Sequence, residues 1–232
     1  MSMDVANLIS SSAPSLIKDN VAAQFRDMII SGAMPPGEAI VEGKWATKLN
    51  VAQASIRAAL NILEGEGFVE RSNARSARVT MIDQADIVHN FQVRTALEAL
   101  SARLVAQHKY NLSDLYQIVA DMRSAVDCNN LKAFYERDLR FHLTLCRLSG
   151  NPVLEQMLKR LLLPLFAFVV MRAHDQMDDT TRWLGSIDKH KQILDAISTG
   201  DPEHAAQVVT EVVSYFSGDM SELTLLKSKQ AH

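Results

Sequence analysis

The sequence predicts a mainly α-helical protein in two parts. The N-terminal part is a winged helix-turn-helix with a small β-hairpin, and the C-terminal part is an all-α bundle of six or seven helices. Three observations predict this fold. Residues 41–65 contain two short amphipathic helical patterns separated by a tight turn. Two alternating runs follow and predict the hairpin. From residue 82 onward, helical periodicity continues without a strand pattern.

The composition is typical of a folded protein without a membrane span. Of 232 residues, 47% are hydrophobic, which is enough for a core. The net charge is −3, and residues 1–80 carry eight basic and eight acidic residues, so nucleic-acid binding would need a local basic patch. Two cysteines, Cys128 and Cys146, argue against a disulfide scaffold. There is no signal-peptide pattern, and the longest apolar run, 161–171, is too short to span a bilayer, so we expect a cytoplasmic protein.

The N-terminus begins with a flexible arm and a first helix. Residues 1–15 are rich in Ser, Ala and Pro and predict the arm. A helix is expected from Leu16 to Gly32, with Met34-Pro35-Pro36-Gly37 as the loop after it. Its apolar stripe consists of Val21, Ala22, Phe25, Met28 and Ile29.

Residues 41–65 predict the helix-turn-helix. Trp45, Ala46 and Leu49 form one face of a short helix, and Asn50 tolerates the left-handed conformation that a tight turn needs. The second helix has an apolar stripe of Ile56, Ala59, Leu60 and Leu63. The opposite face is small and polar, which suits a major groove, and carries Gln53, Ala54, Arg57, Ala58 and Asn61. The same periodicity also fits an ordinary helical hairpin in a core.

The hairpin after the second helix is expected to be the wing of a winged helix. Its strands are predicted at 68–71 and 77–80, around the turn-rich segment 72–76. Arg71, Arg75 and Arg78 make this the most basic segment of the first 80 residues. Arginines on a wing can reach phosphates or a minor groove, although a solvated turn carrying arginines for solubility has the same composition.

The rest of the chain predicts helices only. Asp83 is a candidate N-cap, with Asp86 in the first turn behind it. The breaks between helices are placed by Asn, Gly, Asp and Pro residues. The expected helices cover residues 84–108, 112–128, 130–149, 151–175, 180–199 and 202–226.

Several charged or titratable residues fall on the apolar stripes of these helices. Asp138 and His142 are one turn apart on the same stripe, and His190 lies in the stripe of a later helix. Arg94 and Glu98 occupy the inward face of the first helix. Buried charges must be paired, hydrated or bound to a metal, and imidazoles with a carboxylate suit a divalent transition metal. The alternative is a set of core residues that satisfy one another.

The order of motifs in residues 16–80 resembles the GntR family of bacterial regulators. The matching residues are Gly32 to Gly37, Trp45-Ala46, Val51, Arg57, Ala59-Leu60, Leu63 and Glu66-Gly67-Phe68-Val69. The chain departs from the family at Gln53, Ala58 and Ala74, and the amide of Gln53 can still pair with adenine. The resemblance implies binding to double-stranded DNA. The candidate DNA-binding residues are Lys44, Gln53, Ser55, Arg57, Asn61, Arg75 and Arg78.

Residues 84–226 resemble the FCD ligand-binding domain of the FadR branch of that family. The motifs are Arg94-x-x-x-Glu98, Asp138-x-x-Phe141-His142, Ser149-Gly150-Asn151, His190-x-x-Ile193-Leu194-x-Ala196-Ile197 and Gly200-Asp201-Pro202. In many such domains an Asp and three His bind a metal beside the effector pocket. Here Asp138, His142 and His190 match three ligands, and Val212 stands where the fourth is expected. Two interpretations follow from this substitution: one Zn or Ni ion with three protein ligands, or a degenerate site that binds an organic ligand directly. The resemblance also implies an acidic effector near Arg94 and Glu98.

The expected domains are an arm at 1–15, a winged helix at 16–81, and an effector-binding and dimerisation domain at 82–232. The expected function is a metabolite-responsive transcription regulator, more often a repressor in this family, that binds a palindromic operator as a homodimer. Its partners would be DNA and a small carboxylate-bearing metabolite. Two alternatives remain: a metal-free regulator with an apolar effector, and a metal-dependent helical protein with a vestigial winged helix. No nucleophile or separate general base points to an enzyme.

Overall fold

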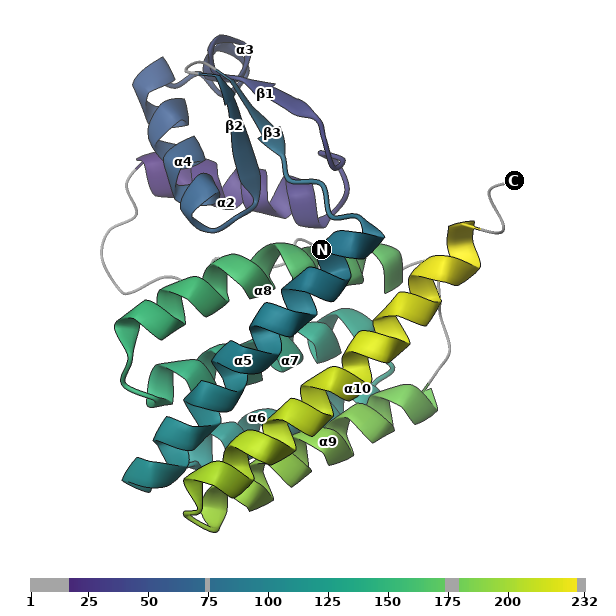
Figure 1. Ribbon diagram of the computed structural model, residues 1–232. Coiled ribbons are helices and arrows are strands. Elements are labelled where there is room, and N and C mark those ends of the chain that lie inside the picture. The colour runs from purple at the N-terminus through teal and green to yellow at the C-terminus, as the bar shows by residue number, and fades with distance from the viewer. Residues whose placement is uncertain (1–16, 74–75, 174–179, 229–232) are drawn as a thin grey trace. The chain divides into compact units, whose positions relative to one another are not determined.

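The computed structural model describes residues 17–73, 76–173 and 180–228, and side chains at several segment ends are not described (Figure 1). Within this part, the chain forms two compact units. The first contains the residues up to Ile82 and the second half of α8 from Leu163 onward. The second contains Asp83–Leu162 and the described residues from Thr180 onward.

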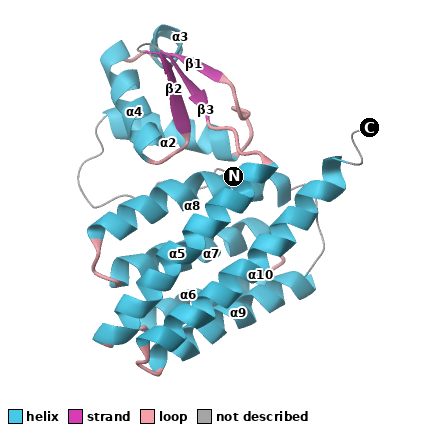
Figure 2. Cartoon of the chain, viewed as in Figure 1, coloured by secondary structure: helices cyan, strands magenta, loops and turns pink. Residues whose placement is uncertain are grey.

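Apart from the second half of α8, the first unit combines three helices with a small sheet (Figure 2). The strand order β1-β3-β2 is antiparallel throughout. Phe25 and Trp45 pack edge to face with ring centroids 4.9 Å apart, and Leu60 and Phe68 are fully or almost fully buried. The elements are α2 (Ile17–Ile30), β1 (Ala39–Val41), α3 (Glu42–Leu49), α4 (Gln53–Gly65), β2 (Val69–Asn73) and β3 (Ser76–Val79).

The turn between α3 and α4 has the predicted backbone. Asn50 caps α3 in the left-handed conformation, with φ 52° and ψ 47°. This conformation lets the chain reverse within the three residues before α4 begins at Gln53. The predicted hairpin is also present as β2 and β3.

The sheet contains one strand that the sequence did not predict. β1 pairs with β3, with Ile40 opposite Ala77. At three residues it is too short to show alternation, and it follows the turn at Gly37, where φ is +80°. The expected two-stranded hairpin is therefore corrected to a three-stranded sheet.

The second unit is helical, as predicted. Asp83 and Asp86 form a reciprocal capping box at the start of α5, so the expected N-cap is confirmed. The α5 and α10 helices lie side by side (Figure 1). No helix in the described ranges has the length and apolarity needed to cross a membrane. The helices are α5 (Gln84–His108), α6 (Ser113–Asp127), α7 (Leu131–Leu148), α9 (Thr180–Ser198), α10 (Pro202–Ser228) and the part of α8 (Pro152–Ala173) that precedes Leu163.

Candidate functional site

The α4 helix presents a polar stripe to solvent. Its apolar side buries Ile56, Leu60 and other residues completely, so the opposite side faces outward. Gln53, Arg57 and Asn61 are exposed and are spaced four residues apart along that side. Lys44 on α3 is exposed as well, whereas Ser55 is half-buried. The residues expected to contact DNA on these two helices therefore include four exposed side chains.

Glu42, the first residue of α3, lies behind this stripe and is fully buried. Its Oε2 accepts from Gln53 Nε2 at 3.2 Å and from Arg57 Nη2 at 2.8 Å. Its Oε1 accepts from Arg71 Nη1 of β2 at 3.2 Å. The hydrogen bonds from Arg57 first, and then those from Gln53 and Arg71, hold the pKa of Glu42 below its usual value against the opposing effect of burial.

Sequence reasoning missed Glu42 because an acidic residue in the first turn of a helix is common on a protein surface. The sequence does not reveal that this carboxylate is buried and contacts side chains from two other elements. The only signal available was its position in the first turn of the helix that precedes the polar stripe.

The arginines of the wing have different partners. Arg71 is bonded to Glu42, to Asn61 of α4, and to Glu64 at 3.5 Å. Arg78 is exposed, and its Nη1 donates to the carbonyl oxygen of Gly37 at 3.0 Å. Arg75 lies outside the described residues. Arg71 thus links the wing to α4, and Arg78 is the described wing arginine with an exposed side chain.

A second polar cluster lies inside the helical unit. Asp138 and His142 come from α7 and His190 from α9, and one ligand atom from each lies within 4.8 Å of the others. His190 Nε2 is 2.8 Å from Asp138 Oδ1, and His142 Nε2 is 3.3 Å from the same oxygen. Both histidines are buried. The structure therefore brings together the three residues that were expected to bind a metal.

Two buried atoms of this cluster, one from His190 and one from Asp138, have no hydrogen-bond partner among the described residues. The Nδ1 of His190 lies 2.7 Å from the carbonyl oxygen of Ser186, which only accepts hydrogen bonds, so Nδ1 carries a proton and Nε2 is the nitrogen that faces Asp138. Within the described residues, His190 Nε2 and Asp138 Oδ1 are both buried and lack a hydrogen-bond partner. An imidazole nitrogen and an ionised carboxylate oxygen 2.8 Å apart need a positive charge between them, either a proton on the nitrogen or a cation. This donor set fits a divalent transition metal.

Arg94 and Glu98 extend the cluster from α5. Arg94 Nε donates to Glu98 Oε1 at 2.6 Å, and Arg94 Nη2 lies 2.8 Å from His142 Nε2. His142 Nδ1 lies 2.7 Å from Glu98 Oε2. The predicted effector-binding pair is thus bonded to a predicted metal ligand. Val212 is buried and aliphatic, so it supplies no fourth ligand.

The charges in this cluster shift one another's pKa values. Burial raises the pKa of Glu98, but Arg94 and His142 more than reverse this and bring it to about 2. Burial likewise opposes ionisation of Asp138, and His142 and His190 lower its pKa further than burial raises it. Burial, and then the charge of Arg94, lower the pKa of His142, but the Glu98 and Asp138 carboxylates together more than reverse this and raise it. Both carboxylates are therefore ionised near neutral pH.

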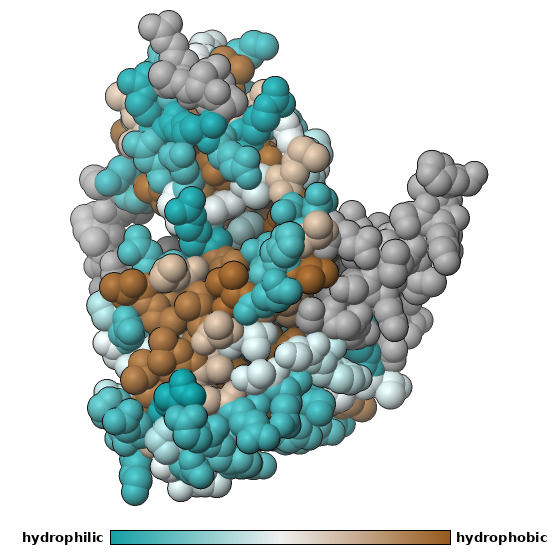
Figure 3. All heavy atoms as spheres, in the orientation of Figure 1, coloured by the Kyte–Doolittle hydropathy of each residue, from teal (hydrophilic) through white to brown (hydrophobic). Residues whose placement is uncertain are grey.

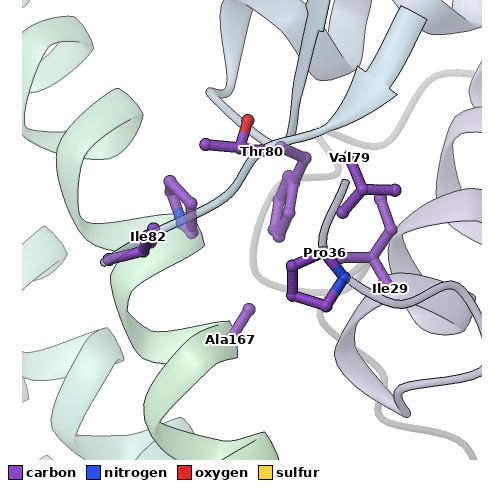
Figure 4. Close-up of a pocket in the computed structure, with 8 residues that line it drawn as sticks. Ile29, Pro36, Val79, Thr80, Ile82 and Ala167 are labelled. Atoms are coloured by element: carbon purple, nitrogen blue, oxygen red, sulfur yellow. The ribbon is translucent and has the colours of Figure 1, made fainter. Parts of the chain in front are cut away.

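A small pocket in the first unit is not a candidate effector site. It has a volume of about 20 Å³, which is room for about one water molecule. Its lining is mostly apolar (Figure 4). A metabolite would not fit, and the pocket offers no charged group to an acidic ligand.

Two family models match the chain. The model described as bacterial regulatory proteins, gntR family, matches residues 17–79. The FCD domain model matches residues 89–214.

Curated relatives and solved structures agree with these matches. A probable D-xylose utilization operon transcriptional repressor of Paenarthrobacter nicotinovorans is 26% identical over 87% of this chain and 89% of its own. The gluconate operon transcriptional repressor of Bacillus licheniformis is 24% identical over 88% of this chain and 85% of its own. The structure of E. coli McbR/YncC covers 91% of this chain and 99% of that one, with a TM-score of 0.72 at 16% identity, which shows a shared fold.

Proposed function

Because this chain belongs to the gntR family of bacterial regulatory proteins and carries an FCD domain, we propose that it is a metabolite-responsive repressor. It would act in the cytoplasm as a homodimer on a palindromic operator, with a small acidic effector and one divalent metal in the helical domain. The relatives named above are transcription regulators and not enzymes. The single observation that supports an effector site most strongly is the pair of buried acceptors, Asp138 Oδ1 and His190 Nε2.

The exposed stripe of α4 supports DNA binding in the major groove. Gln53, Arg57 and Asn61 lie on one side of a helix that ends before the wing begins. A helix with its polar residues on one side can place them against base edges, while Lys44 and Arg78 lie on neighbouring elements that can meet phosphates. Since a palindrome presents two equivalent half-sites, two copies of the chain would bind it.

An exposed apolar surface supports the homodimer. Apolar side chains gather over α8 and α5 in the second unit (Figure 3). Among the described side chains of these helices, the large exposed apolar ones are Val93, Val153 and Met157, with exposed fractions of 50%, 64% and 55%. A contiguous apolar surface of this kind is typical of a contact between proteins, and a second copy of the chain is the partner that a palindromic operator requires.

The metal would be held by Asp138, His142 and His190. A divalent cation with three protein ligands keeps open positions and supplies Lewis acidity toward an anionic ligand. Arg94 lies beside His142 and would add a guanidinium for a carboxylate. Gluconate, after which one relative's operon is named, is a hydroxycarboxylate, and we propose this chemical class for the effector.

Metal content and DNA release test this proposal together. The full-length protein would be stripped with a chelator, reloaded with Zn²⁺ or Ni²⁺ and assayed for bound metal, and Asp138→Ala should bind none. His89→Ala, which changes an exposed histidine of α5, serves as the matched control. A panel of hydroxycarboxylates should then release wild-type protein, but not Asp138→Ala, from a selected operator duplex.

The outcomes separate the alternatives. A protein that binds no metal, and that releases DNA in response to an apolar ligand regardless of Asp138→Ala, would be a metal-free regulator. A protein that binds metal, but whose binding to its own promoter region is insensitive to Arg57→Ala, would contradict a role for the winged helix in DNA recognition.

A further inference from the structure

The exposed stripe of α4 is anchored by a single buried group. Glu42 receives hydrogen bonds from Gln53 and Arg57 of α4 and from Arg71 of β2. Its side chain has no exposed surface, while Arg57 is about half exposed at 51%. A fully buried carboxylate needs donors on both oxygens, and both oxygens of Glu42 have them. Its partners are therefore held in fixed orientations.

The contact with Glu42 determines which way the amide of Gln53 points. An ionised carboxylate only accepts hydrogen bonds, so the amide nitrogen and not the amide oxygen must face it. Gln53 Nε2 lies 3.2 Å from Glu42 Oε2 and uses one of its two hydrogens there. The other hydrogen and the amide oxygen remain for a second partner. A donor and an acceptor on one amide match N7 and N6 of adenine in the major groove.

The same carboxylate fixes the guanidinium of Arg57. Arg57 Nε and Nη2 both point to Glu42, at 3.1 Å and 2.8 Å from Oε2. This uses the side edge of the guanidinium and leaves the end edge, formed by Nη1 and the second hydrogen of Nη2. Two parallel donors at that edge match O6 and N7 of guanine.

We propose that Glu42 is a positioning residue for base recognition, which orients Gln53 toward an adenine and Arg57 toward a guanine in each operator half-site. This inference rests on the proposed placement of α4 in the major groove. Side chains four residues apart on a helix are separated by about 6 Å, and successive bases on a strand by about 3.4 Å. The two recognised base pairs are therefore neighbours or are separated by one pair.

Selection from a random duplex library with wild-type, full-length protein gives the first test. Each half-site should contain an adenine and a guanine within this spacing. Replacing either base with its 7-deaza analogue removes the N7 acceptor and should weaken binding about tenfold. This test requires no change to the protein, so it does not depend on the folding of a variant. A selected site in which neither 7-deaza base alters affinity would overturn the proposal.

The second test repeats the selection with Glu42→Gln. We expect the base preference to weaken at the adenine and guanine positions and to stay unchanged at the other positions of the half-site. The new amide at position 42 can turn either its nitrogen or its oxygen toward Gln53 and Arg57, so it no longer fixes their orientation. Glu64→Gln is the matched control, since Glu64 contacts Arg71 but neither Gln53 nor Arg57 in the described contacts. A uniform loss at all positions would indicate a structural role for Glu42 and contradict the proposal.

A comparison of two backgrounds separates failure of this inference from failure of the proposed function. Glu42→Gln should weaken binding to the selected duplex about tenfold in the wild-type background and less than about twofold in a background that carries both Gln53→Ala and Arg57→Ala, where neither oriented side chain is left. If Arg57→Ala weakens binding but Glu42→Gln does not, the positioning role is wrong and α4 still binds DNA. If neither change matters, the placement of α4 in the groove is wrong as well.

Discussion

Two carboxylates, Glu42 and Glu98, are fully buried in the core of different units. Each is ionised because basic side chains bond to it. Glu42 has Arg57 and Arg71, and Glu98 has Arg94 and His142. Removing one partner of such a group leaves an uncompensated charge in the interior, which is more costly than losing an exposed ion pair.

The lowered pKa of Glu42 predicts a pH-dependent contribution to stability. A carboxyl whose pKa is lower in the folded state stabilises the fold above its unfolded pKa, here 4.5, and this contribution is lost as the pH falls through the folded value. At neutral pH, wild-type protein should therefore be more stable than Glu42→Gln by about 1.5–3 kcal/mol. Urea unfolding from pH 7 to pH 3 should show this difference shrinking below pH 4.5. A difference that stays constant over this range would contradict the argument.

Arg94 is expected to compete with a metal for His142. Its Nη2 lies 2.8 Å from His142 Nε2, the atom that a cation at this cluster would use. Arg94→Gln removes a positive charge from the cluster and should strengthen Zn²⁺ binding at least about tenfold in calorimetric titration. Arg103→Gln, which changes a partly exposed arginine of α5, should leave the affinity unchanged. Weaker Zn²⁺ binding in Arg94→Gln would show that Arg94 supports the metal site instead.

The two clusters differ in how far the sequence could predict them. Asp138, His142 and His190 interrupt apolar stripes, so periodicity alone placed them on inward faces. Glu42 interrupts no stripe, and its environment is created by donors from α4 and β2. A residue whose role depends on contacts between elements leaves no local pattern.

At the scale of helices and strands, strong hydrophobic periodicity was sufficient to predict where the long helices begin and end. The described bounds of the six helices from α5 to α10 lie within two residues of the predicted ones, and the predicted end at residue 175 lies outside the described residues. The strand β1 was missed because three residues show no period, and its pairing with β3 is nonlocal. Propensity and pattern describe the residues of a segment but not the segment that it will pair with.

A buried ion pair joins α2 to the end of α4 and should matter more than an exposed one. Arg26 donates through Nε and Nη2 to Glu66, and these side chains are 5% and 14% exposed. Arg103 and Glu203 make a similar forked contact at 40% and 77% exposure. Arg26→Ala should lower the free energy of unfolding of the first unit by about 3–5 kcal/mol.

Arg103→Ala should lower the free energy of unfolding of the second unit by no more than about 1 kcal/mol. Denaturant unfolding followed by the tryptophans separates the two effects, since Trp45 lies in the first unit and Trp183 in the second. If Arg26→Ala and Arg103→Ala lowered the free energy of unfolding equally, burial would not determine how much these ion pairs contribute to stability.

For the whole molecule, the proposed dimer predicts that charges on α8 separate the two copies. Val153→Glu combined with Met157→Glu places two carboxylates on an apolar surface that is more than half exposed in the single chain. Sedimentation should then show one copy per particle where the wild-type protein shows two, and affinity for the operator should fall. Tyr116→Glu changes an exposed aromatic residue of α6 and is the control. A dimeric double variant would place the contact elsewhere.

The pairing of Arg57 with Glu42 also determines how DNA binding responds to salt. A cation that neutralises a phosphate releases condensed ions, and each such contact adds about 0.9 to the slope of log affinity against log salt concentration. Arg57 already has a carboxylate as its counter-charge, so its contact with a base should release few ions. Arg57→Ala should therefore lower affinity at every salt concentration with almost no change in slope.

Arg78→Ala, which removes an arginine bonded to a neutral carbonyl, should reduce the slope by about one. If α4 reads bases as proposed, its low net charge favours specific over nonspecific DNA binding, because nonspecific binding depends on the attraction between basic side chains and phosphates.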